Sequence, residues 1–188
     1  GPSVDGVPIP VCKRTRAKRS RCFKNEAGYS YCAAKDEKYY GFRGHLVING
    51  SGIITNFAFA KASIDERDVV PELTEGLTGL LIGDKGYIRP YLREKLLRRK
   101  LVLQTPFKKN MKDNRPKKFI RLLMAIRRRI ETIIGQLTER FHIQKVRARD
   151  WWHLSNRLSR KILAHIVCSF INCHLCRPAT QFDGLVKI

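Results

Sequence analysis

Three acidic residues stand out in this sequence because each is placed where it could bind a metal ion. Asp5 lies in VDGVPIPVC, Asp84 in LLIGDKGY and Glu131 in RRRIETIIGQL. Acids are scarce in this chain, with 16 Asp and Glu against 38 Lys and Arg. Mg²⁺ prefers carboxylate oxygens as ligands, and a strongly basic chain attracts a polyanion. The combination predicts metal-dependent chemistry on a phosphodiester substrate.

Each acid also has an ordinary structural explanation when it is taken alone. Asp84 stands between two glycines in GDKG, a sequence typical of a plain turn. Glu131 follows an apolar residue on a predicted helix, where Arg127 or Arg128 would pair with it one turn away. The prediction that the three acids act together therefore depends on their order along the predicted elements.

The charge of the chain predicts its partner. A net charge of +22 favours nucleic acid, with an anionic membrane surface as the second possibility. Lysine and arginine runs contact phosphates without reading sequence, although a solvated loop is the simpler interpretation of any one run. We expect the run in residues 13–24 to lie next to Asp5. The predicted DNA-binding residues are Lys13, Arg14, Arg16, Lys18, Arg19, Lys85, Lys108, Lys109, Arg127 and Arg128.

The elements that must position the acids follow from apolar periodicity and turn signals. Residues 4–11 read as a strand that Pro8 and Pro10 assign to a sheet edge or strand end. A hairpin follows, around an Asn-Gly-Ser-Gly turn, and then a short helix capped by Ser63. The strands are predicted at residues 39–48, 53–60, 78–82 and 101–105, and the helices at 63–73, 89–100, about 116–141 and about 154–173.

This order predicts an α/β fold with a mixed sheet. The hairpin gives an antiparallel part, and the later strands alternate with helices and should run parallel. We expect one domain over residues 1–176 and a loose tail over 177–188. No apolar run reaches the roughly 20 residues that span a bilayer, and the first ten residues lack a secretory signal, so we expect a cytoplasmic protein. Gly1-Pro2 resembles the remnant of a removed tag, and we expect natural residues to precede it.

The four motifs in this order resemble those of DDE transposases from bacterial insertion sequences. VDGVPIPVC resembles their first-acid motif, YYGFRGHLVI their second strand, GDKGY their second-acid motif, and RRRIETIIGQL their third-acid helix with an Arg four residues before the Glu. The resemblance spans about residues 4–149 and implies a ribonuclease H-like fold. Three positions depart from the family pattern: Gly6 replaces a Ser, Met124 a Tyr and Thr138 a Lys.

The resemblance also implies an activity and a cofactor. Asp5, Asp84 and Glu131 would be catalytic and would bind two Mg²⁺ ions, for which Mn²⁺ can substitute, with Asp5 bridging them. The reaction would cut double-stranded DNA at the ends of a mobile element and join those ends to target DNA, with at least a dimer on the DNA. The resemblance also implies a bacterial protein that is associated with the nucleoid. The alternatives are a related ribonuclease H-like nuclease without strand transfer, and a domesticated or inactive DNA-binding module. A basic structural protein of a ribonucleoprotein is more distant.

Other side chains carry weaker signals. The six cysteines are expected to be free thiols, because only Cys173 and Cys176 have the spacing of a metal-binding pair and no second pair lies nearby. Trp151 and Trp152 either stack on bases or anchor the start of the last helix, and the anchor is the simpler interpretation. His45 alternates with strand residues and is predicted to lie in the core.

Overall fold

A long antiparallel strand pair forms the centre of the fold. In this computed structural model, which describes residues 1–107 and 111–185, β1 (Ser3–Lys13) pairs with β3 (Glu37–Ile48). The pairing runs from Ser3 opposite Ile48 to Lys13 opposite Tyr39, so it covers all of β1. The other edge of β3 pairs with β2 (Gly28–Cys32) at its start and with β4 (Ile54–Lys61) at its end, both antiparallel.

The sheet continues on the far side of β1 with two parallel strands. β5 (Gly79–Ile82) joins β1 at the pair Ser3 and Ile82, and β6 (Leu101–Gln104) pairs with β5 along its whole length. Antiparallel and parallel strands therefore share one six-stranded sheet. The prediction of a mixed, ribonuclease H-like α/β fold is confirmed.

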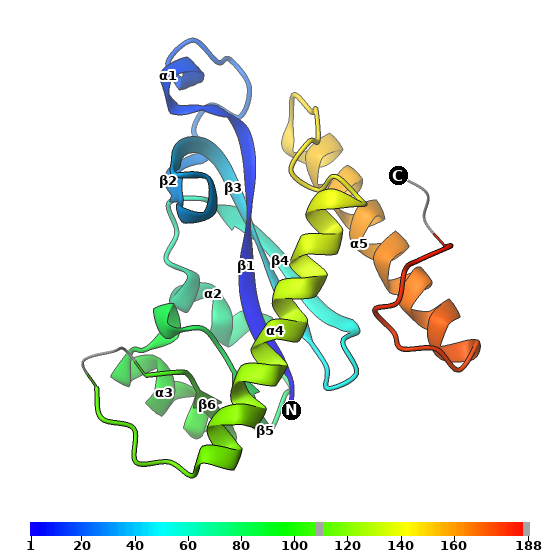
Figure 1. Cartoon of the computed structure of the whole chain (residues 1–188). Coiled ribbons are helices and arrows are strands. Elements are labelled where there is room, and N and C mark those ends of the chain that lie inside the picture. Colours follow the sequence, from blue (N-terminus) through cyan, green and yellow to red (C-terminus); the bar gives the residue numbers. More distant parts are fainter. Residues whose placement is uncertain (108–110, 186–188) are drawn as a thin grey trace.

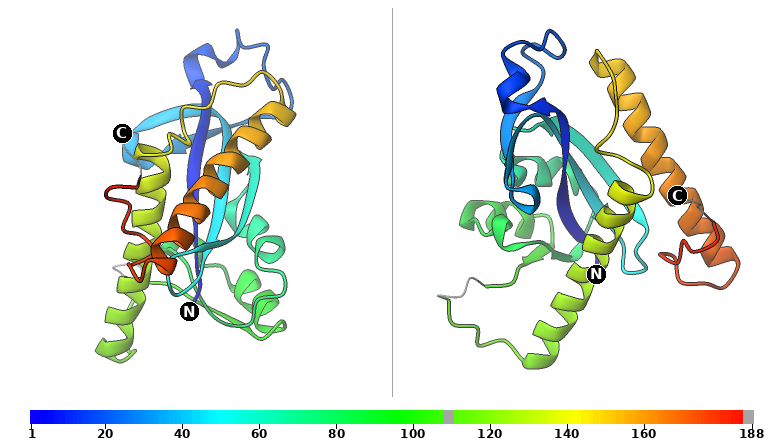
Figure 2. Two further views of the ribbon diagram at one scale, coloured as in Figure 1. Left: turned by 90° about the vertical axis from the view of Figure 1, so that its right-hand side faces the viewer. Right: turned by 45° about the horizontal axis from the view of Figure 1, so that its top comes forward.

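Helices cover both faces of this sheet, as Figures 1 and 2 show. On one face α2 (Glu66–Leu73) and α3 (Pro90–Leu97) pack on a core that includes Val4, Val47 and Leu81. On the other face lie α4 (Lys117–Glu139) and α5 (Trp151–His174). Alternate strand residues point to opposite faces, so the two cores draw on the same strands.

The core under α4 and α5 is the larger of the two. It contains Val7 and Ile9 of β1, Leu46 of β3, and Ile130 and Ile133 of α4, all essentially inaccessible to solvent. The buried positions of α4 recur every three or four residues, at Leu123, Ile126, Ile130, Ile133 and Leu137. This spacing places one face of α4 on β1. The packing therefore fixes where along the strand the polar residues of α4 lie.

Some local predictions need correction. The expected Ser63 cap is wrong, because the Asp65 carboxylate accepts the Arg67 N–H and α2 begins at Glu66. The last helix begins earlier than expected, with the Asp150 carboxylate capping it through the His153 N–H. The basic stretch after β1 contains a short helix, α1 (Arg14–Ala17), and neither α1 nor β2 was predicted. Both are short elements without apolar periodicity, so whether they form depends on tertiary contacts and strand pairing.

The prolines of β1 fit their predicted edge position. β1 meets β5 only at Ser3, so Pro8 and Pro10 lie where β1 pairs on one side alone. The end of the chain is more ordered than expected. Phe182 is buried against Phe141 and His165, and the Asn172 amide donates to the Gln181 carbonyl. The division into a domain of residues 1–176 and a tail stays a prediction.

Within the described part of the chain, no helix is both long and apolar enough to cross a membrane.

Candidate active site

Asp5 sits on β1 where that strand leaves β5. It has the same strand parity as Val7 and Ile9, which directs it toward the face covered by α4. Its Oδ1 accepts the Gly6 N–H at 2.8 Å. The buried pairing with Leu46 of β3 fixes the backbone here, so the position of the carboxylate is set by the centre of the sheet.

Asp84 follows β5 directly, at the same edge of the sheet. Gly83 is buried, and an added Cβ would lie 3.1 Å from the ring of Tyr87, so the glycine allows that ring to pack closely. The Asp84 carbonyl accepts the Tyr87 N–H and starts a 3₁₀ turn, η2 (Lys85–Tyr87). The Asp84 side chain does not cap this turn and is free to point toward α4.

Glu131 and Arg127 lie one turn apart on α4, and Arg127 links Glu131 to Asp84. The Arg127 Nη2 lies 3.0 Å from Asp84 Oδ1 and 2.9 Å from Glu131 Oε1. The guanidinium is mostly buried, whereas the two carboxylates are half exposed. One arginine therefore holds together two acids from different elements. The acid cluster comprises Asp5, Asp84, Arg127 and Glu131.

The electrostatics of Asp5 connect it to the same cluster. Burial raises the pKa of Asp5 to about 6, and the negative charges of Asp84 and Glu131 contribute to the rise. The Gly6 N–H and the positive charge of Arg127 oppose this rise in the pKa. Asp5 is thus a buried carboxylate whose negative charge is only partly compensated by its neighbours. A bound cation would stabilise the charged form of this carboxylate.

The donor types of the cluster suit a divalent cation, since all three acids offer hard carboxylate oxygens. Among residues 1–107 and 111–185, however, no three acid, histidine or cysteine side chains are grouped closely enough to hold one metal ion. The positive charge between Asp84 and Glu131 belongs to Arg127. A cation shared by these acids therefore requires Arg127 to release them.

An ion pair beside Asp5 was not predicted from the sequence. Arg43 of β3 pairs with Glu66 at the start of α2, and its Nε is buried without a partner. An added Cβ on Gly6 would lie 3.4 Å from Glu66 Oε2, which places this pair next to the acid cluster. Cavities of about 500 and about 420 Å³ meet at Asp5, Arg43 and Glu66. Arg43 lies in the quoted YYGFRGHLVI segment, but neither residue was predicted to belong to the site, because only the β1–β3 register and the approach of α2 bring them to Asp5.

A comparison with protein families shows to which family this chain belongs. The family model described as the transposase DDE domain matches residues 2–151, which includes all three acids and every strand of the sheet. The chain belongs to the transposase DDE domain family. No curated protein matches the sequence. Residues 152–188, which form nearly all of α5 and the end of the chain, lie outside the family match.

The predicted DNA-binding residues of this DDE domain separate into two places. Lys85, Arg127 and Arg128 lie beside or within the acid cluster. The run that begins at Lys13 lies at the opposite end of β1, and eight residues of strand place it roughly 26 Å from Asp5. The expectation that this run lies next to Asp5 is therefore wrong. Lys108 and Lys109 fall outside the described residues.

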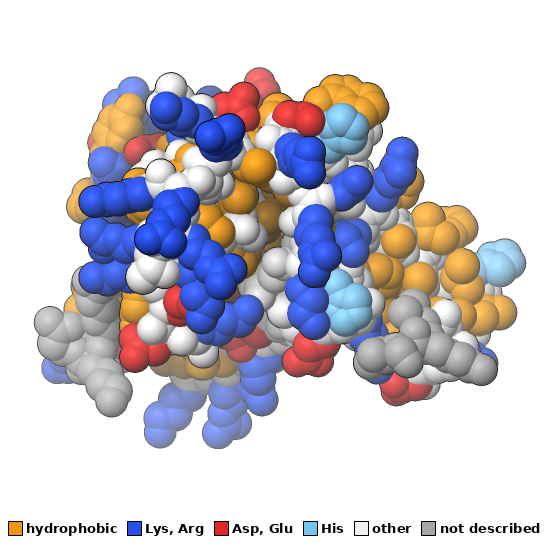
Figure 3. Space-filling model, turned by 90° about the horizontal axis from the view of Figure 1, so that it is seen from above, with side chains coloured by type: hydrophobic (Ala, Val, Ile, Leu, Met, Phe, Trp, Pro, Cys, Tyr) orange, Lys and Arg blue, Asp and Glu red, His pale blue; other side chains and the backbone are white. Residues whose placement is uncertain are grey.

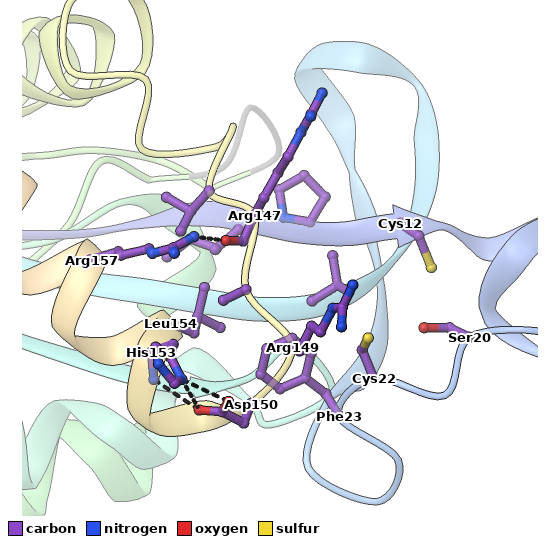
Figure 4. Close-up of a pocket in the computed structure, with 15 residues that line it drawn as sticks. Cys12, Ser20, Cys22, Phe23, Arg147, Arg149, Asp150, His153, Leu154 and Arg157 are labelled. Carbon is purple, nitrogen blue, oxygen red and sulfur yellow. Dashed lines mark hydrogen bonds and ion pairs between the residues drawn. The ribbon is translucent and has the colours of Figure 1, made fainter.

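The far end of β1 contains a basic surface in which Arg147, Arg149 and Arg157, which the sequence did not indicate, join the predicted run that begins at Lys13. A cavity of about 610 Å³ lies between the end of β1, the turn that follows α1 and the start of α5, with Cys12, Cys22 and Phe23 on one side (Figure 4). Figure 3 shows Lys and Arg side chains on both sides of a hollow on this face. We call this surface the basic end; its residues are Lys13, Arg14, Arg16, Lys18, Arg19, Arg147, Arg149 and Arg157.

The remaining predicted side chains have structural explanations. Trp151 packs on Phe42 with ring centroids 5.0 Å apart, which fits the predicted anchor, whereas Trp152 is 67% exposed. His45 is buried as predicted, and both of its ring nitrogens lack a partner. Burial lowers the pKa of His45 to about 4, with a further lowering by the charge of Arg43. All six cysteines are free thiols.

Proposed function

We propose that this DDE domain cuts DNA at the ends of a mobile element and transfers the freed strands into target DNA in a divalent-metal-dependent reaction. The observation that carries the proposal is the meeting of Asp84 and Glu131 at the Arg127 guanidinium, within the electrostatic reach of Asp5. Three acids from a strand, a strand end and a helix converge there, and family membership supports the transposase chemistry.

In this proposal Asp5, Asp84 and Glu131 would hold Mg²⁺ or Mn²⁺ through their carboxylate oxygens. A pair of such ions supplies Lewis acidity at the scissile phosphate. Asp5 contributes a carboxylate whose pKa is raised chiefly by burial and further by the negative charges of Asp84 and Glu131. Arg127 neutralises Asp84 and Glu131 in the absence of DNA and turns toward a phosphate when it releases them. Lys85, exposed next to Asp84, contacts the backbone beside the scissile bond.

The distance between the basic end and the acid cluster suits duplex DNA. The basic end lies roughly 26 Å from Asp5 along β1, which corresponds to about eight base pairs of B-form DNA. Phosphate contacts at both places would fix the position of the duplex without reading its sequence. Since transposition joins two element ends to one target, we propose that at least two copies act together on DNA.

Nicking of supercoiled plasmid tests the proposed reaction. Wild type should nick in the presence of Mg²⁺ or Mn²⁺ and not with EDTA, and Asp84→Asn should remove this activity. Asp183→Asn, which alters an acid that is 82% exposed and pairs with Arg140 at the C-terminal end of α4, is the matched control and should nick normally. Equal nicking by wild type and Asp84→Asn would contradict the assignment of Asp84.

Joining of a pre-cut element end to a target plasmid separates the transposase from its nearest alternative. A transposase should join a free 3′-hydroxyl end, and a related nuclease should nick without joining. DNA binding that survives in Asp84→Asn, together with an absence of metal-dependent nicking in wild type, would instead indicate a binding module.

A further inference from the structure

The C-terminal half of α5 presents an apolar surface that differs from the rest of the molecule. Leu163, Val167, Phe170, Ile171 and Leu175 recur at helical spacing and are 39–69% exposed. Figure 3 shows hydrophobic side chains gathered on the side of the molecule where α5 lies. Single exposed apolar residues are ordinary on protein surfaces, but five that share one helix face form a patch. We call these five residues the α5 stripe.

The α5 stripe lies in the longest part of this helix without formal charge. Residues 162–176 contain no Lys, Arg, Asp or Glu, in a chain with 38 basic and 16 acidic residues. The inner face of the same segment is already used, since Ile162, His165 and Ser169 are buried. The outer face is thus free of the positive charge that would repel another copy of the chain.

Four of the five residues in the α5 stripe, all except Phe170, are placed symmetrically along the helix. Leu163 and Leu175 each lie six residues from position 169, and Val167 and Ile171 each lie two residues from it. An antiparallel second helix, related by a twofold axis beside this position, would set each of these residues against its counterpart. Self-complementary surfaces of this kind are what twofold homodimers require.

We propose that the α5 stripe is the surface through which two copies of this chain pair, with their α5 helices antiparallel. The occupant is a second copy because an acidic partner would be drawn to the basic surfaces, whereas this face offers no charge to recognise. The surface is specified by α5 alone. Only its purpose, to hold two element ends together, depends on the proposed function.

The size of the patch sets the expected strength of pairing. Five partly exposed apolar side chains leave on the order of 300 Å² of apolar surface on each copy. A stable interface uses about 800 Å² from each partner, so free protein should pair weakly. Two copies on one DNA molecule have a raised effective concentration, which would favour the pairing there.

Salt should act on this pairing in the opposite direction to its action on DNA binding. The two copies carry a net charge of +22 each, and this repulsion opposes association. Raising the salt from about 0.1 to about 0.5 M screens the repulsion and should strengthen pairing. The same change should weaken DNA binding steeply, because counterion release no longer favours it.

Sedimentation velocity of the whole chain tests the proposal with two matched pairs of variants. Leu163→Glu and Leu122→Glu alter leucines that are 59% and 53% exposed, on α5 and on α4. Phe170→Glu and Tyr91→Glu alter aromatics that are 69% and 66% exposed, on α5 and on α3. Each substitution adds one negative charge, so a general charge effect would act equally within a pair.

Wild type and the two control variants should show a dimer that grows with protein concentration, from about 10 to 300 μM, and with salt. Leu163→Glu and Phe170→Glu should weaken that dimer at least tenfold. A wild type that stays monomeric at both salt concentrations, a dimer insensitive to Phe170→Glu, or open-ended aggregation would each overturn the proposal.

Two further measurements separate this proposal from the proposed function. Asp84→Asn should dimerise like wild type even though it does not nick. Phe170→Glu should still nick plasmid but lose joint processing of two element ends. Dimerisation without any metal-dependent nicking would leave the α5 surface intact and reject the enzyme, and the reverse pattern would reject the surface alone.

Discussion

The acid cluster and the basic end lie at opposite ends of β1 and are built in different ways. At the acid cluster, charges are partly buried and compensated at short range: Arg127 contacts two carboxylates, and Asp5 has a raised pKa. At the basic end, most of the lysines and arginines are exposed, and neighbouring positive charges outnumber acids. Geometry that is held by packing suits chemistry, whereas exposed charges attract a polyanion without fixing its position.

This contrast divides the expected effects of substitution. Changes at the acid cluster should alter the rate of cleavage more than the affinity for DNA. Changes at the basic end should alter affinity and its salt dependence, with little effect on the rate at saturating DNA. Neither pattern would be seen if the two regions belonged to one undivided binding surface.

The largest expected effect comes from removing the charge of Glu131. Glu131→Gln should lower metal-dependent cleavage by more than about 100-fold, since loss of a ligand exceeds the 10–100-fold cost of losing a supporting group. DNA affinity should change little in a filter-binding or anisotropy assay. Glu139→Gln, an exposed glutamate two turns along α4, is the matched control. Equal losses of cleavage in Glu131→Gln and Glu139→Gln would contradict the assignment of a special role to Glu131.

Neutralising the basic end should produce the second largest effect. Replacing Arg14, Arg16, Lys18 and Arg19 by Gln should weaken DNA binding by about 10–100-fold at low salt. The slope of log affinity against log salt should fall by about one for each phosphate that is no longer neutralised. An equal number of Gln substitutions at Arg93, Lys95, Arg98 and Lys100, around α3, should have a smaller effect. A reversed ranking would place the DNA path elsewhere.

The success of the sequence predictions differs between the same two regions. The acid cluster could be predicted because its acids lie beside strong periodic signals: an apolar strand before Asp84 and a regular helix around Glu131. The pair of Arg127 with Glu131 was one of two pairings that the helical spacing allowed, and the contact of Arg127 with Asp84 was not predicted. Arg43 and Glu66 could not be predicted, because their proximity to Asp5 depends on the β1–β3 register and the approach of α2.

The basic end shows why the rest of the fold was harder to predict. Residues 13–24 have no apolar period, so neither α1 nor the length of β1 could be read from them. An extended β1 moves this run away from Asp5, which adjacency in sequence does not convey. Arg147, Arg149 and Arg157 reach the same place from the other end of the chain. Only tertiary structure brings these two segments together.

The pH dependence of stability should reveal the burial of His45, which lies opposite Gly6 in the β1–β3 pair. Its folded pKa of about 4 lies below the usual 6.5, so the unfolded chain binds more protons between these values. Stability should therefore fall as pH drops from 6.5 toward 4. Asp5 acts in the opposite direction, since its pKa of about 6 exceeds 3.8 and protonation favours the folded state.

A comparison with His45→Leu isolates this contribution, because both proteins keep Asp5. Between pH 7 and pH 4.5, wild type should lose about 2 kcal/mol more of its free energy of unfolding than the variant, measured by urea titration. His174→Leu, at an exposed position on α5, should retain the wild-type pH dependence. Parallel curves for wild type and His45→Leu would show that this imidazole is not buried.

The smallest effect is expected from Arg127 as a counter-ion. Arg127→Gln removes the charge that competes with a cation for Asp84 and Glu131, so the Mg²⁺ concentration for half-maximal activity should fall by about two- to tenfold. The maximal rate should also fall, because the variant cannot pair with a phosphate. Arg128→Gln, at the exposed neighbouring position, should leave the metal dependence unchanged. A higher metal requirement in Arg127→Gln would contradict its role as a competitor.

Anomalous diffraction from crystals grown with Mn²⁺ and a short DNA duplex tests the central claim most directly. The account predicts manganese peaks in contact with Asp5 and with both Asp84 and Glu131, and an Arg127 guanidinium that has left both of those carboxylates. If crystals of protein that nicks DNA under the same conditions show Arg127 still bridging Asp84 and Glu131, with manganese bound elsewhere, the three acids are not the metal-binding site.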